Sequence, residues 1–312
     1  EITTRLVGSE MCIRDRYNWG LRASIIQGRV PRNLQRTVLG ISQSIAMFLQ
    51  PIGQSIGIMV LSYTHSYAMA GYINALTFLI AAIALYIGKD SIQLPHSIEG
   101  GIQGRSDSFR VVMKQMGSVL KSATKINVPL LMVSIMVLNA LAAGMGVIIN
   151  LTLLKTSVSI HLSYGETVLL VNVFNIVGVI IGSLVNTKLT AKMSVRTILS
   201  FADSCLMLLF LNLWFIHSFL LILVPYFLLG WGIGQFNPKL DSEVMKLADS
   251  HIIGIVSGAI VSIATIASPV GSIGLVLLYN LVPSWVTYGI AIGLLIFQLL
   301  WVAVDRGKNI DV

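Results

Sequence analysis

Long runs of hydrophobic residues, separated by short polar stretches, organise most of this chain. Eight runs can be placed, and each is about as long as the roughly 20 residues that an α-helix needs to cross a bilayer. They lie near residues 38–62, 67–88, 128–150, 165–187, 198–217, 219–238, 253–279 and 283–304. The pattern predicts an all-α, polytopic membrane protein with about eight transmembrane helices.

Two of the runs resemble each other at a constant offset of 218 residues. Residues 40–61 read GISQSIAMFLQPIGQSIGIMVL, and residues 258–279 read GAIVSIATIASPVGSIGLVLLY. The matched positions include Gly40 and Gly258, Ser44 and Ser262, Pro51 and Pro269, and Gly53 and Gly271. Internal repeats in a membrane chain are typical of secondary transporters, whose substrate site lies between the halves. Because these are the first and seventh runs, the predicted repeat unit is six helices.

Composition and charge agree with a membrane protein. Hydrophobic residues make up 55% of the chain and charged residues 11%, whereas soluble domains carry about 25% charged residues. If residues 17–37 are cytoplasmic, 17 of the 21 Lys and Arg residues lie on that side and only Lys155 lies outside. The other three, Arg5, Arg14 and Arg16, lie within the first 16 residues. This asymmetry follows the positive-inside rule. It places the connector 89–127 and the C-terminus in the cytoplasm, and it accounts for the net charge of +8 without nucleic acid.

The chain divides at its polar stretches. The first 16 residues, EITTRLVGSEMCIRDR, resemble a translated adapter and are set aside as non-native. The predicted parts are residues 1–16, residues 17–88 as the end of an N-terminal six-helix half, the connector 89–127, a C-terminal six-helix half at 128–304, and a tail at 305–312. A native chain of twelve helices, longer at its N-terminus, is expected. The two cysteines, Cys12 and Cys205, offer neither a disulfide framework nor a metal site.

The connector contains one predicted amphipathic helix. Apolar residues recur from Phe109 to Leu120 at helical spacing, and the opposite face carries basic residues. These basic residues are Arg110, Lys114, Lys121 and Lys125. Such a face suits anionic lipid headgroups, although a solvated linker helix has the same pattern.

A six-plus-six repeat with a long cytoplasmic connector resembles the major facilitator superfamily. The stretches IIQGRVPRNLQRTVLGISQS, QPIGQSIG and YINALTFLIAAIAL resemble the helix 4–6 region of drug and siderophore exporters, especially the macrolide-efflux group. The stretch FNPKLDSEVMKLADSHIIGIVSGAIVSIATIASPVGSIGLVLL resembles the helix 10–11 region of the same group. The resemblance spans about residues 20–305. It implies alternating access driven by the proton gradient.

The QPIGQSIG stretch occupies the place of the antiporter motif GPxxGG of the resembled family. Pro51 matches that motif, but Gln50, Gln54 and Ser55 replace its glycines. Small residues at such a position let helices approach closely or bend. The predicted hinge or packing residues are Pro51, Gly53, Pro269 and Gly271.

Asp203 is the one acid well inside a predicted span. A carboxylate in the membrane is costly and is by default a functional candidate, so Asp203 is the predicted proton-coupling residue. The alternative is a structural clamp in which Asp203 pairs with Arg196 or Lys192 near the membrane surface.

The fourth run carries a stripe of small and polar residues. Gly178 and Gly182 form a GxxxG pattern, which favours close helix packing. Asparagines inside a membrane must find hydrogen-bond partners, so they either line an aqueous cavity or join helices. The predicted cavity residues are Asn150, Asn172 and Asn175. Weaker candidates of the same kind are Asn74, Asn139 and Gln235.

The predicted function is secondary active transport of a small amphipathic molecule across the cytoplasmic membrane, by proton-coupled efflux. The predicted partners are a small-molecule substrate, protons and membrane lipids. No catalytic constellation and no phosphate-binding loop of an ATPase occurs in the sequence, so neither an enzyme nor a cofactor is predicted. One alternative is a metabolite transporter without proton coupling. Another is a non-transporting membrane protein, such as a lipid scramblase or an inactive fragment.

Overall fold

The computed structural model describes residues 22–64, 66–88, 109–156, 164–185, 190, 192–248 and 253–308. Over these ranges the chain is helical and contains no strand. All eight predicted runs form helices: α2 (Gln35–Thr64), α3 (Tyr67–Ile87), α6 (Val128–Thr156), α7 (Tyr164–Leu184), α9 (Val195–Leu211), α10 (Leu220–Leu247), α11 (Ile253–Leu281) and α12 (Ser284–Lys308). The predicted all-α, polytopic class is therefore confirmed. Six of these helices, α6, α7 and α9 to α12, are long and apolar enough to cross a membrane, and α3 carries a shorter apolar stretch, Gly71–Ile87.

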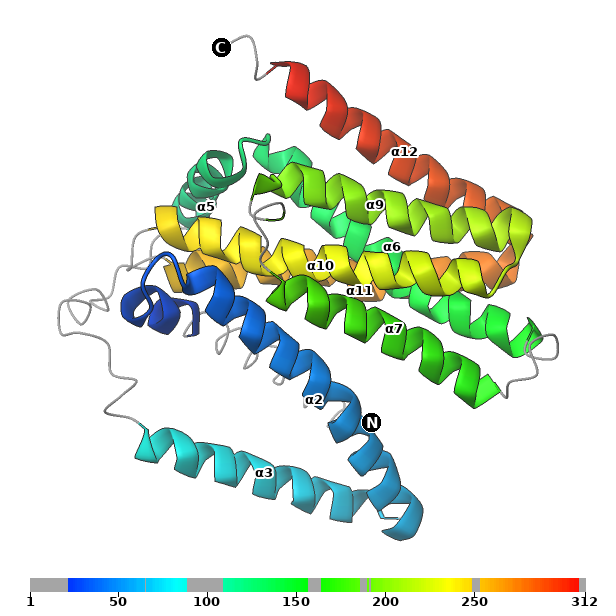
Figure 1. Cartoon of the computed structure of the whole chain (residues 1–312), viewed down its shortest axis with the longest axis horizontal. Helices are drawn as coiled ribbons and strands as arrows, with labels where there is room; N and C mark the ends of the chain where they lie inside the picture. Colours follow the sequence, from blue (N-terminus) through cyan, green and yellow to red (C-terminus); the bar gives the residue numbers. More distant parts are fainter. Residues whose placement is uncertain are drawn as a thin grey trace.

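The six helices from α6 to α12 form a bundle, and α2 packs along its side (Figure 1). Within the bundle, α7 pairs closely with α10, and α6 pairs closely with α11. The connecting helix α5 (Phe109–Thr124) lies at one end of the bundle, against α10. Helix α2 contacts both α7 and α10, and this contact joins the N-terminal segment, residues 22–64, to the bundle.

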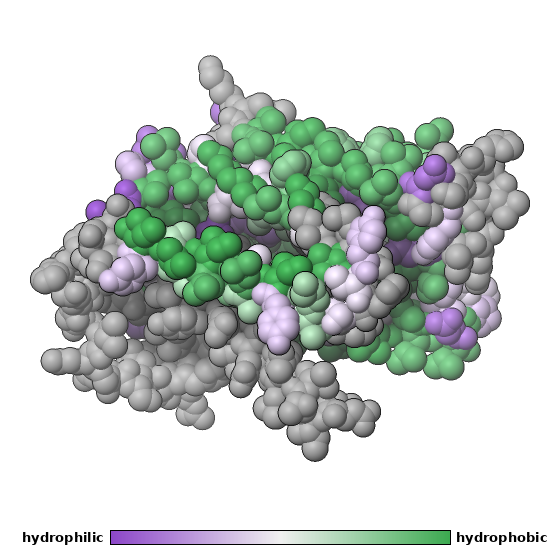
Figure 2. Space-filling model, turned by 90° about the horizontal axis from the view of Figure 1, so that it is seen from below, coloured by the Kyte–Doolittle hydropathy of each residue, from purple (hydrophilic) through white to green (hydrophobic). Residues whose placement is uncertain are grey.

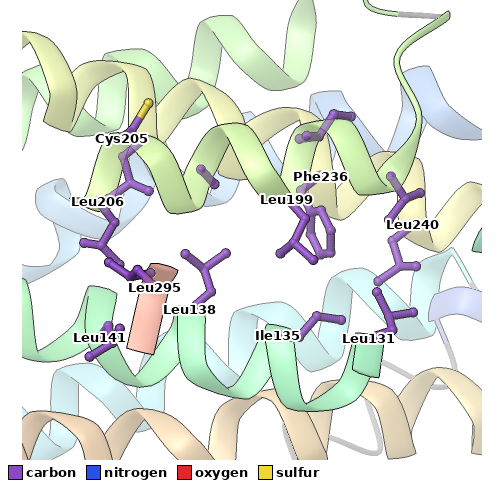
Figure 3. Packing of buried hydrophobic residues seen from close by; sticks show 14 of the residues in the cluster. Leu131, Ile135, Leu138, Leu141, Leu199, Cys205, Leu206, Phe236, Leu240 and Leu295 are labelled. Atoms are coloured by element: carbon purple, nitrogen blue, oxygen red, sulfur yellow. The ribbon is translucent and has the colours of Figure 1, made fainter. Parts of the chain in front are cut away.

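The bundle core is built from aliphatic side chains at helical spacing. Leu131, Ile135, Leu138 and Leu141 of α6 point toward residues of α9 and α10, as Figure 3 shows. All four side chains are buried. Dispersion contacts among such buried side chains stabilise the helix pairs. Helical spacing thus places these buried side chains on one face of α6.

Large apolar side chains cover much of the outer surface. Exposed ones occur on nearly every helix, including Phe215, Ile266, Phe297 and Leu300. Among the described residues seen in Figure 2, hydrophobic ones dominate and hydrophilic ones lie mainly toward the two ends. Exposed apolar surface of this extent is solvated by lipid. The chain is a multi-pass membrane protein.

Helix α10 is longer than its apolar run predicts. The run was expected to end at Pro238, with a cytoplasmic loop from residue 239, but the helix continues to Leu247 and includes both Pro225 and Pro238. The extension is amphipathic, and its apolar residues Leu240, Val244 and Met245 are buried. Burial of this face, next to α5, supports the helix past the proline. The charged residues after position 238 therefore lie on a helix rather than in a loop.

The connection between α9 and α10 is very short. A π-helical turn, η3 (Asn212–Ile216), ends at His217, whose φ of 57° is left-handed. The Asn212 side chain then closes the turn on both sides, because its amide donates to the Ser218 carbonyl at 2.9 Å and its oxygen accepts from the Ser218 N–H at 3.1 Å. An amide side chain thus supplies the hydrogen bonds that a longer loop would take from water.

Helix α5 confirms the predicted amphipathic helix in the connector. Met116 and Leu120 are buried, whereas Lys114 and Lys121 are exposed. The apolar face of α5 packs on the bundle, so it is not available for insertion into lipid.

Candidate functional site: a cavity in the bundle and the interface beside it

Two glycine pairs allow α7 and α10 to touch backbone to backbone. A Cβ added at Gly178 or Gly182 would overlap the carbonyl oxygen of Phe227 or Trp231, respectively. Across the contact, a Cβ added at Gly230 or Gly234 would overlap the carbonyl oxygen of Asn175 or Val179, respectively. The GxxxG pattern predicted on α7 therefore packs against a second one, Gly230-x-x-x-Gly234, which sequence reasoning missed. Its spacing of four was the available signal.

The α6–α11 pair is similarly close at Gly271. A Cβ there would overlap the backbone of Ala140, and a Cβ on Gly144 would overlap the Leu275 side chain. Gly271 thus lies at a helix–helix contact. Pro269, two residues earlier, is exposed, and Gly53 on α2 has no heavy atom of the described residues within 4 Å of an added Cβ.

A cavity of about 190 Å³ lies in the bundle, lined by residues of α6, α9, α10 and α11. Most of its wall is apolar. The apolar lining residues are Ile135, Leu138, Ala142, Ala202, Ile233, Phe236, Leu240, Ile260, Val261 and Ala264. Four polar side chains face it from three helices: Asn139, Asn237, Asp241 and Thr265. An apolar wall with a few placed polar groups is the usual lining of a small-molecule site.

The predicted cavity asparagines take other positions. Asn175 donates a hydrogen bond to the Tyr226 carbonyl at 2.8 Å, and this bond joins α7 to α10. Asn172 is exposed and donates to the Val168 carbonyl of its own helix at 2.8 Å. Asn150 is half-buried on α6. The asparagines that line the 190 Å³ cavity are Asn139, a weaker sequence candidate, and Asn237, which was not a candidate.

Asp203 lies in the bundle core, where α6, α9 and α12 meet. Its side chain is 0% exposed, and its Oδ2 accepts a hydrogen bond from the Gln298 amide at 2.7 Å. The same amide lies 3.3 Å from the Ser134 carbonyl oxygen. Three buried oxygens here have no hydrogen-bond partner within the described part of the chain: Asp203 Oδ1, Gln298 Oε1 and Ser134 Oγ.

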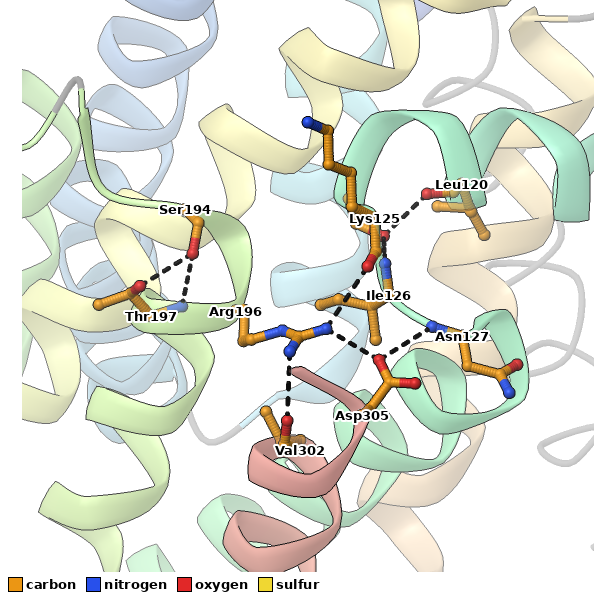
Figure 4. A network of polar contacts seen from close by, with 10 residues as sticks. Leu120, Lys125, Ile126, Asn127, Ser194, Arg196, Thr197, Val302 and Asp305 are labelled. Carbon is orange, nitrogen blue, oxygen red and sulfur yellow. Dashed lines mark hydrogen bonds and ion pairs between the residues drawn. The ribbon is translucent and has the colours of Figure 1, made fainter. Parts of the chain in front are cut away.

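Arg196 does not pair with Asp203 but with Asp305. Its guanidinium pairs with Asp305 on α12 at 2.8 Å and also donates to the carbonyls of Val302 and Lys125 at 3.4 Å (Figure 4). This network ties the start of α9 to the end of α12 and to the α5–α6 junction. The interpretation of Asp203 as a clamp on Arg196 is therefore wrong, because Arg196 already has a carboxylate partner in Asp305, near the ends of α9 and α12.

A second, smaller cavity of about 120 Å³ lies between the N-terminal segment and α10. Arg22 and several α2 residues line one side, and Asn237, Pro238 and Asp241 line the other. Burial lowers the pKa of the Arg22 guanidinium, and the negative charge of Asp241 partly offsets this lowering. Asp241 is thus shared by both cavities. Sequence reasoning missed it because position 241 fell in a predicted loop, although the Asn237–Asp241 spacing of four places both on one helix face.

Polar contacts flank this second cavity and hold the N-terminal segment on the bundle. Arg36 donates to Gln235 at 2.6 Å, and the Gln235 amide donates to the Val185 carbonyl at 2.7 Å. The hydroxyls of Ser44 and Ser183 lie 2.5 Å apart. In addition, the Gln27 amide donates to the carbonyls of Met245 and Ala248 at 2.7 Å.

The comparison with protein families agrees with this architecture. The family model described as Major Facilitator Superfamily matches residues 18–272, which is most of the chain. The chain belongs to the major facilitator superfamily. A search of curated proteins returned no match. As a major facilitator, the protein is a secondary transporter that binds a small-molecule substrate, and the cavity in its bundle is the candidate site.

Proposed function

We propose that this major facilitator exports a small amphipathic molecule across the cytoplasmic membrane and couples export to proton entry. The observation that carries the proposal is the 190 Å³ cavity. Its wall offers ten apolar side chains and four polar ones, so it matches a ligand with an apolar body and a small polar part. A strongly polar metabolite would leave much of its hydrogen-bonding surface against hydrocarbon at a cost of several kcal/mol.

Asp203 remains the proposed proton-coupling residue. A carboxylate at 0% exposure with only an amide donor beside it is costly in its charged form. Proton uptake removes that charge, and the protonated oxygen can donate to one of the unpartnered oxygens of Gln298 and Ser134. Binding and release of a proton would therefore change the packing of α6, α9 and α12 against each other.

The cavity is tested by filling it. Ala264 lines the cavity on α11, and Ala264→Phe would place a benzyl group inside it. Ala303 on α12 is exposed, so Ala303→Phe is the matched control. Cells that express each variant are loaded with radiolabelled phenyltrimethylammonium, an amphipathic probe small enough for a cavity of about 190 Å³, and retention of the label is followed with and without a protonophore.

The expected result is protonophore-sensitive extrusion of the probe by the wild type and by Ala303→Phe, and loss of extrusion in Ala264→Phe at unchanged protein level. Extrusion that persists at the wild-type rate in Ala264→Phe would refute the assignment of the cavity. Extrusion at the same rate with and without the protonophore would refute proton coupling and favour the alternative of a transporter that is not coupled to protons.

A further inference from the structure

Asp241 is the residue of interest here because it belongs to both cavities. On one side it is the only charged residue among the described residues that line the larger cavity. On the other it lines the smaller cavity together with Arg22. It is half-buried, so each cavity offers its carboxylate a partly dehydrated environment in which a charge partner counts for more than it would in water.

Arg22 is the cation that acts on Asp241. The two charges interact. The other charged side chains nearby act on one another. Arg36 and Lys239 are both attracted to Glu243. Lys239 is also repelled by Arg36 and Lys246. A cationic side chain that lined the larger cavity from α6, α9 or α11 would compete with Arg22 for Asp241, but none of the described lining residues on those helices is charged.

We propose that the substrate is an organic cation with an apolar body, and that it competes with Arg22 for the carboxylate of Asp241. This inference rests on the proposed function, because it assigns the substrate class of the same cavity. The apolar wall would take the body, and Asp241 would face the positive charge. Without that carboxylate, a cation entering the cavity would lose its hydration with no charge to replace it.

The competition has a structural consequence. Arg22 belongs to the N-terminal segment, and Asp241 belongs to the bundle. A cation bound in the larger cavity lowers the negative potential that holds Arg22, so substrate binding weakens one attachment between the segment and α10. By reciprocity, removal of the Arg22 charge strengthens binding of the cation.

Phenyltrimethylammonium and its uncharged isostere tert-butylbenzene provide the test, because they differ in charge and hardly in shape. Binding of each to the purified protein in lipid nanodiscs is measured by calorimetry, with empty nanodiscs subtracted. The variants are Asp241→Asn, the charge-preserving control Asp241→Glu, and Arg22→Gln. Thermal unfolding of each variant checks that it is folded.

The expected result is a cation affinity that falls about tenfold or more in Asp241→Asn, is largely retained in Asp241→Glu, and rises several-fold in Arg22→Gln. Binding of tert-butylbenzene should be the same in all of them. Unchanged cation binding in Asp241→Asn, or weaker cation binding in Arg22→Gln, would overturn the inference. A wild-type protein that binds both probes equally would overturn the substrate class but leave the cavity standing. A wild-type protein that binds neither would overturn the cavity assignment as well.

Discussion

The glycine contact between α7 and α10 makes a quantitative prediction for Gly182→Ala. An alanine Cβ at this position would lie less than 3.0 Å from the Trp231 carbonyl oxygen, a separation that real Cβ atoms essentially never show. The obstacle is backbone, so no side chain can rotate away and the helices must separate. Overpacking of this kind costs about 1–3 kcal/mol. The better helix propensity of alanine returns at most about 1 kcal/mol, so a net loss of up to about 2 kcal/mol is expected.

Gly293→Ala is the matched control. Gly293 also lies within a long apolar helix, α12, but no heavy atom of the described chain lies within 4 Å of its added Cβ. The propensity gain is then uncompensated, and this variant should be stabilised by about 0.5–1 kcal/mol. Because the propensity gain is common to both variants, their free energies of unfolding should differ by the overpacking cost, about 1–3 kcal/mol.

The assay is equilibrium unfolding in mixed detergent micelles, with the free energy of unfolding read from the change in helicity as the fraction of denaturing detergent rises. Addition of Gly234→Ala to Gly182→Ala gives a third measurement, and because both residues lie in one contact, their combined cost should fall below the sum of the two. If Gly182→Ala and Gly293→Ala shift the unfolding midpoint equally, backbone contact between α7 and α10 is not what these glycines provide.

Three further variants test other parts of the structure. Asp203→Asn should fold and still bind substrate, but transport driven by an imposed pH gradient in proteoliposomes should be lost; retention of the gradient response would remove Asp203 from the coupling step. Arg196→Gln leaves the mostly buried Asp305 without its 2.8 Å partner and should lower the free energy of unfolding by about 1–3 kcal/mol; a change below 0.3 kcal/mol would show the pair to be solvated like a surface one. Ser183→Ala removes the hydroxyl contact with Ser44 and should cost about 0.6 kcal/mol, measured as faster hydrogen exchange in α2; exchange at the wild-type rate would mean that α2 is held by its other contacts.

The sequence predicted the helices because a lipid-facing helix needs apolar residues over its whole length, and that requirement is visible without knowing any neighbour. Which helices pair is a different matter. Gly178 and Gly182 were recognisable as a packing motif, but nothing local identified Gly230 and Gly234 as the surface they meet. A contact between two helices depends on how each helix is rotated about its own axis, and amino-acid composition determines neither rotation.

The candidate site was less predictable for a related reason. Asp241 follows Pro238 and sits among other charges, so hydropathy alone places it in a loop. Its position on a helix depends on burial of Leu240, Val244 and Met245, which is a tertiary effect. Asn175 shows the converse case: its polarity inside a span was informative, but one residue pattern serves both a cavity wall and a hydrogen bond between helices, and only the 2.8 Å contact to the Tyr226 carbonyl distinguishes them.

The short turn at Asn212–Ser218 also bears on how the protein is made. Two long helices are joined with only His217, Ser218 and Phe219 between η3 and α10, and the polar groups of the turn bond to each other. A connection of three residues is too short to cross the membrane by itself as a free loop while the second helix is still being synthesised. During biosynthesis α9 and α10 would thus enter the bilayer together as a helical hairpin, and an insertion after His217 should disturb membrane integration before it disturbs transport.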